Sequence, residues 1–151
     1  MRQLIIARKD LQMSAGKLAA QVSHASMAFL SYTIRNSAVP KASVETGETD
    51  RYETLLSIPE DVYEQWFCGI YTKTICEAKN RNHLLKAAAM AEELGLKENV
   101  DFFLIRDNCL TELEPEEIDE DGVGHTLTCI GFKPLSDETS HAISRKYQLY
   151  K

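Results

Sequence analysis

The sequence predicts a single α/β domain in which helices pack around a mostly parallel sheet of four strands. Four short apolar runs have the length and composition of buried strands, and helical patterns alternate with the first three of them. No helical pattern separates the third run from the fourth, so this connection can place one strand antiparallel. At 151 residues, the chain is long enough for one hydrophobic core and too short for two ordinary domains.

The first part of the chain predicts a buried strand, a long helix and an irregular insertion. Residues 4–7 form a continuous apolar run, which is typical of a strand that is buried on both faces. Residues 14–35 have helical periodicity and begin with a serine that can serve as the N-cap. Residues 36–57 contain a proline and a glycine and show no period, which predicts a loop or insertion. The apolar stripe of the helix consists of Ala15, Leu18, Val22, Ala25 and Phe29.

Turn and cap residues divide the rest of the chain into three more strands and three more helices. A short helix is predicted from Pro59 to Gly69, and a stronger one follows Asn80 and stops at Gly95. The last helix begins at Ser136. Strands are predicted over residues 72–78, 102–105 and 126–132.

The composition predicts a globular cytoplasmic protein. It is 44% hydrophobic and 26% charged, which is typical of globular proteins and excludes a disordered or collagen-like chain. No window approaches about 18 consecutive apolar residues, so we expect no membrane-spanning helix, and the apolar run near the N-terminus is too short for a secretory signal. The four cysteines lack metal-site spacing, so we expect reduced, buried thiols rather than zinc ligands or disulfides.

No cofactor motif is present. Ser14-Ala15-Gly16-Lys17 is similar to the end of a phosphate-binding loop, but leucines stand at positions 11 and 18, where that loop needs glycine and serine or threonine. Neither the dinucleotide-binding glycine motif nor the serine motif of α/β-hydrolases occurs. We therefore expect neither a metal ion nor an organic cofactor.

The negative charge is concentrated in one segment. The net charge is −6, but residues 112–121 hold seven of the 23 acidic residues and no basic one. The rest of the chain therefore has 16 acidic residues against 17 lysines and arginines, which still permits a basic face. We expect the acidic run to be a solvated loop that folds away from the face that carries Lys17. The alternative is a loop that lies over the site and repels wrong anions.

Three polar residues of the long helix share one face opposite its apolar stripe. Lys17, Gln21 and His24 lie within about 60° of one another at helical spacing. The helix follows a buried strand, so its N-terminus lies at the carboxyl end of that strand, where ligands bind in open α/β sheets. Free backbone N–H groups at this end favour an anion. The alternative is that this face is merely exposed to water.

Asp107 ends the third predicted strand and reaches the same edge of the sheet if the strands are parallel. With Lys17 and the hydroxyls of Thr111 and Thr126, this carboxylate could activate a water molecule and stabilise an oxyanion. Aspartate at a strand end is also a common turn former, and that alternative stays open.

Residues 7–30, ARKDLQMSAGKLAAQVSHASMAFL, resemble the opening signature of the archaeal- and eukaryotic-type peptidyl-tRNA hydrolases, R-x-D-L-x-M-x-x-G-K-x-A-A-Q-x-x-H-A. FFLIRDNCLTEL and HTLTCIGFKPLS are similar to two later family segments. The resemblance implies one domain over residues 1–151, with a mixed four-stranded sheet between helices, and a homodimer. It also implies hydrolysis of the ester bond between a peptidyl or N-blocked aminoacyl group and the 3′ end of tRNA, without a cofactor.

The resemblance also implies site residues. The catalytic group comprises Lys17, Gln21, His24, Asp107, Thr111 and Thr126, and the expected tRNA contacts are Arg8, Lys9 and Lys73.

Three departures from the family pattern favour a competing interpretation. Asn108-Cys109-Leu110-Thr111 stands where the family has Ala-Gly-Arg-Thr, Phe132 follows Ile-Gly in place of proline, and Glu77 replaces a second lysine. Losing an arginine and a lysine weakens binding to a polyanion. The chain could therefore be a non-catalytic RNA- or protein-binding module on the same fold.

Overall fold

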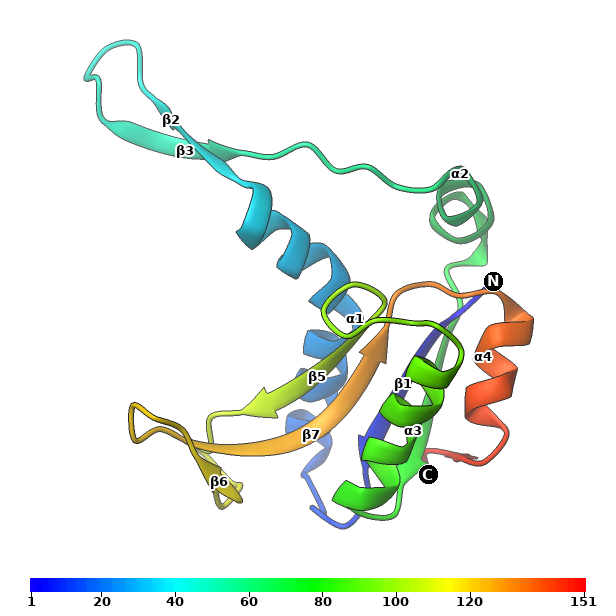
Figure 1. Ribbon diagram of the computed structural model, residues 1–151. Coiled ribbons are helices and arrows are strands. Elements are labelled where there is room, and N and C mark those ends of the chain that lie inside the picture. The colour runs from blue at the N-terminus through cyan, green and yellow to red at the C-terminus, as the bar shows by residue number, and fades with distance from the viewer.

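Four long strands form the centre of the sheet in the computed structural model, which describes residues 1–151. Two-residue strands at its margins, β6 (Glu117–Ile118) and β8 (Gln148–Leu149), bring the sheet to six strands in the order β5-β7-β1-β4-β8, with β6 paired to β7 (Figure 1). The four predicted strands are present. The two further strands were not predicted, because a strand of only two residues is too short to show a periodic pattern. The central strands are β1 (Gln3–Arg8), β4 (Lys73–Ala78), β5 (Phe102–Asp107) and β7 (Gly124–Phe132).

The sheet is mixed, as the resemblance implies. β1 pairs with β4 in parallel, and β7 lies antiparallel between β1 and β5. β1, β4 and β5 therefore run in one direction, and their last residues, Arg8, Ala78 and Asp107, mark one edge of the sheet. We call this the carboxyl edge. The helix-free connection over residues 108–123 is what reverses β7.

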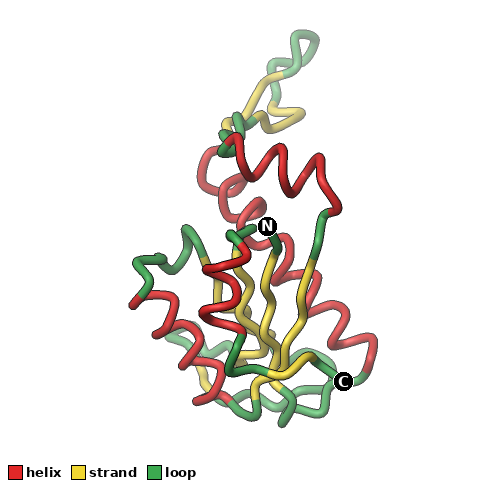
Figure 2. Tube along the Cα trace, turned by 90° about the vertical axis from the view of Figure 1, so that its right-hand side faces the viewer, coloured by secondary structure: helices red, strands yellow, loops and turns green.

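Helices cover both faces of the sheet, as Figure 2 shows. The helix α1 (Ala15–Ser37) packs on one face against a cluster that includes Ile5, Ala7 and Cys129. The helices α3 (Arg81–Glu93) and α4 (Asp137–Ser144) cover the other face, where the larger cluster lies. α1 approaches β7 so closely that a Cβ atom at Gly131 would lie 2.3 Å from the carbonyl oxygen of Ala25. Only glycine fits there. The larger cluster includes Leu4, Ile6, Leu84, Ile130, Phe132 and Ile143.

The prediction that the insertion over residues 36–57 is irregular is wrong for the end of α1 and for two strands within it. α1 continues to Ser37, and the chain then forms a hairpin of β2 (Val39–Ala42) and β3 (Thr49–Glu53) that projects away from the sheet (Figure 1). Gly47 adopts a φ of 73° in the turn. Every residue of both strands is exposed, so neither strand has the alternation of apolar and polar residues that identifies a half-buried strand.

The predicted helix after Pro59 is present, but with an unexpected geometry. One α-helical turn, α2 (Glu60–Val62), continues as a π-helix, η1 (Tyr63–Ile70). Trp66 is buried in η1 and packs edge-on against Phe29 of α1. No helix of the protein is both long and apolar enough to cross a membrane.

Candidate active site

Five of the predicted site residues line one cleft at the carboxyl edge. α1 begins just after β1 and contributes Lys17, Gln21 and His24, whereas Asp107 ends β5 and Thr111 follows it. The cleft has a volume of about 290 Å³. Helical spacing on α1 and the parallel direction of β1 and β5 bring these side chains together.

The carboxylate of Asp107 accepts three contacts at the base of the cleft. The Nζ atom of Lys17 lies 2.7 Å from Oδ2, and Nε2 of Gln21 donates to the same oxygen at 2.7 Å. The backbone N–H of Cys109 donates to Oδ1 at 2.9 Å. Both side chains of the ion pair are largely buried, and the carboxylate oxygens keep lone pairs for one further donor such as water.

Gln21 is held by a residue that the sequence analysis did not single out. The hydroxyl of Thr128 donates to Oε1 of Gln21 at 2.6 Å, which leaves the amide N–H groups for Asp107. A β-bulge turns Thr128 toward α1: Ile105 pairs with Cys129 and Arg106 with Leu127, so Thr128 is the extra residue of β7. The Thr126-x-Thr128 pattern is the only sequence signal for this residue.

Lys17 is positioned at both its backbone and its side chain. Ser14 is the N-cap, as predicted, and its Oγ accepts from the N–H of Lys17 at 3.2 Å. The ammonium group of Lys17 also donates to Oγ1 of Thr111 at 3.0 Å. These contacts hold the ammonium between the first turn of α1 and the loop after β5.

The N-terminus of α1 holds a carboxylate that belongs to the acidic run. The N–H and the hydroxyl of Ser14 both donate to Glu112, each at 2.8 Å. These two hydrogen bonds, together with nearby Lys17, lower the pKa of Glu112 below its ordinary value. The N-cap of α1 is therefore already occupied by a carboxylate of the chain itself, as well as offering the first turn to an anion from outside, as the sequence predicts.

The first half of the acidic run lies along the carboxyl edge rather than away from it. Glu116 forms a double hydrogen bond with Arg8, with both distances 2.6 Å, and Glu117 pairs with Arg81 and Arg106. The prediction that the run folds away from Lys17 is therefore wrong up to Glu117. The prediction treated the acidic residues as solvated, whereas the folded chain supplies them with cations and N–H donors. The turn from Asp119 to Asp121 is exposed and makes no ion pair with lysine or arginine.

A comparison with known proteins identifies the family. The family model described as "Peptidyl-tRNA hydrolase PTH2" matches residues 1–150. The chain belongs to this family. A peptidyl-tRNA hydrolase from Methanopyrus kandleri is 33% identical over 138 residues, 91% of this chain and 87% of the relative. Another, from Haloquadratum walsbyi, is 33% identical over 150 residues, 99% of this chain and 100% of the relative. One from Thermoplasma acidophilum is 26% identical over 148 residues, 98% of this chain and 97% of the relative.

One expected catalytic residue of this peptidyl-tRNA hydrolase family member does not face the cleft. Thr126 is fully buried, and its hydroxyl donates to the carbonyl of Glu114 at 2.6 Å and accepts from the N–H of Glu116 at 3.1 Å. Its position therefore suits holding the acidic run against the sheet rather than contacting a substrate.

The expected tRNA contacts are not brought together. Arg8 is only 2% exposed, and its guanidinium bonds to Asp10, Glu116 and the carbonyl of Leu127. Lys73 opens β4 opposite Gln3, so it lies at the far edge of the sheet, where it stacks 3.4 Å from the ring of Tyr71. Lys9 is at the carboxyl edge and is partly exposed.

The cysteines form neither a disulfide nor part of a metal-binding cluster. All four cysteines are free, as predicted, but only Cys76 and Cys129 are buried. Burial raises the pKa of the Cys129 thiol to about 12. No group of three histidine, cysteine or carboxylate side chains lies close enough together to hold a metal ion.

Proposed function

We propose that this protein hydrolyses the ester bond between a peptidyl or N-blocked aminoacyl group and the 3′ end of tRNA, and that Lys17 and Asp107 carry the chemistry. The family membership supports the reaction. The observation that supports the residues is the 2.7 Å pair between the ammonium and the carboxylate at the base of an open cleft, with Gln21 fixed beside it. An acid and a base held together in this way can serve both halves of an ester hydrolysis.

The reaction begins with a water molecule bound to a free lone pair of Asp107. Asp107 takes the proton of the water as its oxygen attacks the ester carbonyl carbon, and the carbonyl electron pair moves onto the oxygen. The ammonium of Lys17 stabilises this oxyanion. When the intermediate collapses, the bond from carbon to the ribose oxygen breaks, and the proton on Asp107 passes to that oxygen. The products are a peptide with a free carboxyl group and tRNA with a free 3′ end.

The other residues of the cleft have supporting roles. Thr111 fixes the ammonium of Lys17 through its 3.0 Å hydrogen bond, and Gln21 fixes the carboxylate of Asp107. His24 lies exposed at the rim of the cleft, where its ring can contact the terminal ribose or base. Each proton transfer has a side chain to serve it, so the proposed steps need no metal ion or organic cofactor.

We also infer a homodimer in the cytoplasm, where peptidyl-tRNA is produced. Tyr52, Leu55 and Ile70 are 69%, 90% and 88% exposed, and an isolated two-stranded hairpin is marginally stable in water. A second copy of the chain would cover such side chains. Light scattering of the purified protein tests this, and a monomer at micromolar concentration would contradict it.

Ester cleavage by the purified protein tests the proposed activity. N-acetyl-aminoacyl-tRNA is mixed with the wild type and with Asp107→Asn, which keeps the shape of the side chain and removes its charge. We expect cleavage by the wild type and a loss of about 100-fold to 10,000-fold in kcat for the variant. If the protein is instead a binding module, the wild type cleaves no ester at low salt and Asp107→Asn leaves its cellular function intact.

A further inference from the structure

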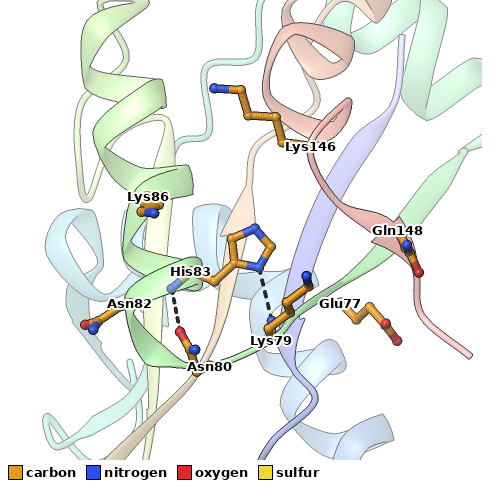
Figure 3. Close-up of a pocket in the computed structure, with 8 residues that line it drawn as sticks. All are labelled: Glu77, Lys79, Asn80, Asn82, His83, Lys86, Lys146 and Gln148. Carbon is orange, nitrogen blue, oxygen red and sulfur yellow. Dashed lines mark hydrogen bonds between the residues drawn. The ribbon is translucent and has the colours of Figure 1, made fainter.

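A second cleft at the carboxyl edge is polar and basic. It lies between the start of α3 and the C-terminal segment and has a volume of about 450 Å³, with no hydrophobic residue in its lining (Figure 3). Lys79 follows β4, Lys86 projects from α3, and Lys146 comes from the segment after α4. His83 lies in the middle of the group in Figure 3.

The three lysines have no carboxylate partner. Lys9, Lys17 and Lys133 each lie within 4 Å of a carboxylate oxygen, whereas Lys79, Lys86 and Lys146 form no such pair. The one acid in the lining is Glu77, whose carboxylate lies 3.7 Å from the ammonium of Lys9. The cleft therefore carries a net positive charge that the chain itself leaves uncompensated.

His83 adds a neutral hydrogen-bond donor to this cleft. Its Nδ1 accepts from the backbone N–H of Lys79 at 3.1 Å, so the ring proton is on Nε2. The ring stacks on Tyr147 at 4.5 Å, which fixes its orientation. Burial, and then the charges of Lys79 and Lys86, lower the pKa of His83. A donor without charge beside three ammonium groups suits an anion with several oxygen atoms.

Two acids between the two clefts are already paired with arginines. Glu116 pairs with Arg8 and Glu117 with Arg81, so these two carboxylates repel a passing polyanion less than their number suggests. β4 is three strands from β5, which separates the clefts by about 14 Å along the same edge. A nucleic-acid strand whose 3′ end lies at Asp107 can therefore continue along this edge.

We propose that this basic cleft binds backbone phosphates of the tRNA acceptor stem while the ester lies between Lys17 and Asp107. This inference rests on the proposed function. The lysines of this cleft, rather than Arg8 and Lys73, then supply the phosphate contacts. Arg8 is buried in ion pairs, and Lys73 lies at the far edge of the sheet. Lysine is a suitable phosphate ligand because its ammonium is a point charge on a flexible stem.

The test compares two substrates and two charge-matched variants. The substrates are N-acetyl-aminoacyl-tRNA and the same N-acetyl-aminoacyl ester on a CCA trinucleotide, which lacks the acceptor stem. The cleft variant is Lys86→Gln/Lys146→Gln. The control variant, Lys41→Gln/Lys97→Gln, removes the same charge from exposed positions outside both clefts. KM and kcat are measured from 50 to 300 mM KCl, about the range over which phosphate contacts weaken.

We expect the cleft variant to raise KM for the full tRNA about tenfold near 100 mM KCl and to reduce the salt slope of log KM by about two. Its KM for the CCA ester and its kcat stay unchanged, and the control variant behaves as the wild type. If wild-type protein cleaves neither ester, the proposed function fails. If it cleaves both and the cleft variant matches the control on the full tRNA, the cleft proposal alone is overturned. Binding of a polyglutamate peptide is measured on the same proteins. If the wild type binds it, the cleft variant does not, and KM for tRNA is unchanged, the cleft serves an acidic protein and the proposal is also overturned.

Discussion

The hydroxyl of Thr128 determines which end of the Gln21 amide faces Asp107. Its oxygen lies 2.6 Å from Oε1 of Gln21 and 3.1 Å from the carbonyl of Ile105, but it has only one hydrogen to donate. If it donated to Ile105, the amide would have to turn its oxygen toward the carboxylate of Asp107, and the two oxygens would repel. The network is satisfied only when Thr128 donates to Gln21.

Thr128→Val is therefore expected to lower kcat by about 10-fold to 100-fold, because Gln21 no longer holds the carboxylate in place. The variant leaves a buried amide oxygen without a donor, which lowers the free energy of unfolding by about 1–3 kcal/mol. Steady-state kinetics and thermal denaturation measure the two effects.

Thr128→Ser is the matched control because it keeps the hydroxyl. It should retain most of kcat even if the lost methyl group lowers stability. If the valine and serine variants lose kcat equally, the hydrogen bond to Gln21 has no part in catalysis.

Glu112→Gln should lower the stability of the protein above about pH 4.5 and have little effect below it. The folded-state pKa of Glu112 is below its ordinary value of 4.5 because Ser14 donates two hydrogen bonds to the carboxylate. A depressed folded-state pKa contributes stability that is present above pH 4.5 and is lost as the pH falls through the folded-state pKa. The difference in Tm between wild type and variant should therefore be largest above pH 5 and shrink below pH 4.5.

The control for this experiment is Glu120→Gln. Glu120 lies in the same acidic run, is exposed and makes no side-chain hydrogen bond, so its Tm difference should be small at every pH. A Tm difference for Glu112→Gln that stays constant from pH 3 to pH 7 would show that the carboxylate does not titrate with folding.

Cys109 stands where relatives are expected to have glycine, and its backbone explains that preference. Its φ is 53°, in the left-handed region, which costs a residue with a Cβ about 1–2 kcal/mol. Glycine relieves this strain but loses more entropy on folding, about 0.5–1 kcal/mol. Cys109→Gly should be at least as stable as the wild type and should keep its kcat, since the N–H that contacts Asp107 remains. Cys109→Ala, which keeps the strain, should be less stable than Cys109→Gly in thermal denaturation.

Periodicity and strand direction account for what the sequence could predict of the cleft. Lys17, Gln21 and His24 share a face because helical spacing requires it, and Asp107 joins them because β5 runs parallel to β1. The same rule could have placed Lys73 correctly. It is the first residue of a strand parallel to β1, so it lies at the opposite edge from the last residue of β1.

The contacts that the sequence could not predict depend on the path of an irregular loop. Glu112 and Ser14 are 98 residues apart, and Glu116 and Arg8 are 108 apart. No period relates such positions, and a run of acids is normally solvated. The bulge that turns Thr128 toward Gln21 is likewise a local change of register that apolar patterning over 126–132 does not reveal.

The contacts of Arg8 indicate a structural role rather than a role in tRNA binding. Its guanidinium donates to Asp10, to Glu116 and to the carbonyl of Leu127, and the residue is only 2% exposed. Hydrogen bonds to Glu116 and Asp10 outweigh the effect of burial and raise its pKa above the ordinary value. Lysine can replace arginine as a phosphate ligand, but its single ammonium cannot reproduce a fork that bonds two carboxylates.

Arg8→Lys therefore separates the two roles. If Arg8 is structural, the variant loses about 2 kcal/mol of stability, which lowers Tm by about 5 °C, while the salt slope of KM for tRNA stays as in the wild type. Arg2→Lys is the control, because Arg2 pairs with Asp137 at an exposed site and should lose little. We expect the large loss at Arg8 alone. An Arg8→Lys variant with unchanged Tm would contradict the structural role, because the buried network would then add nothing to stability.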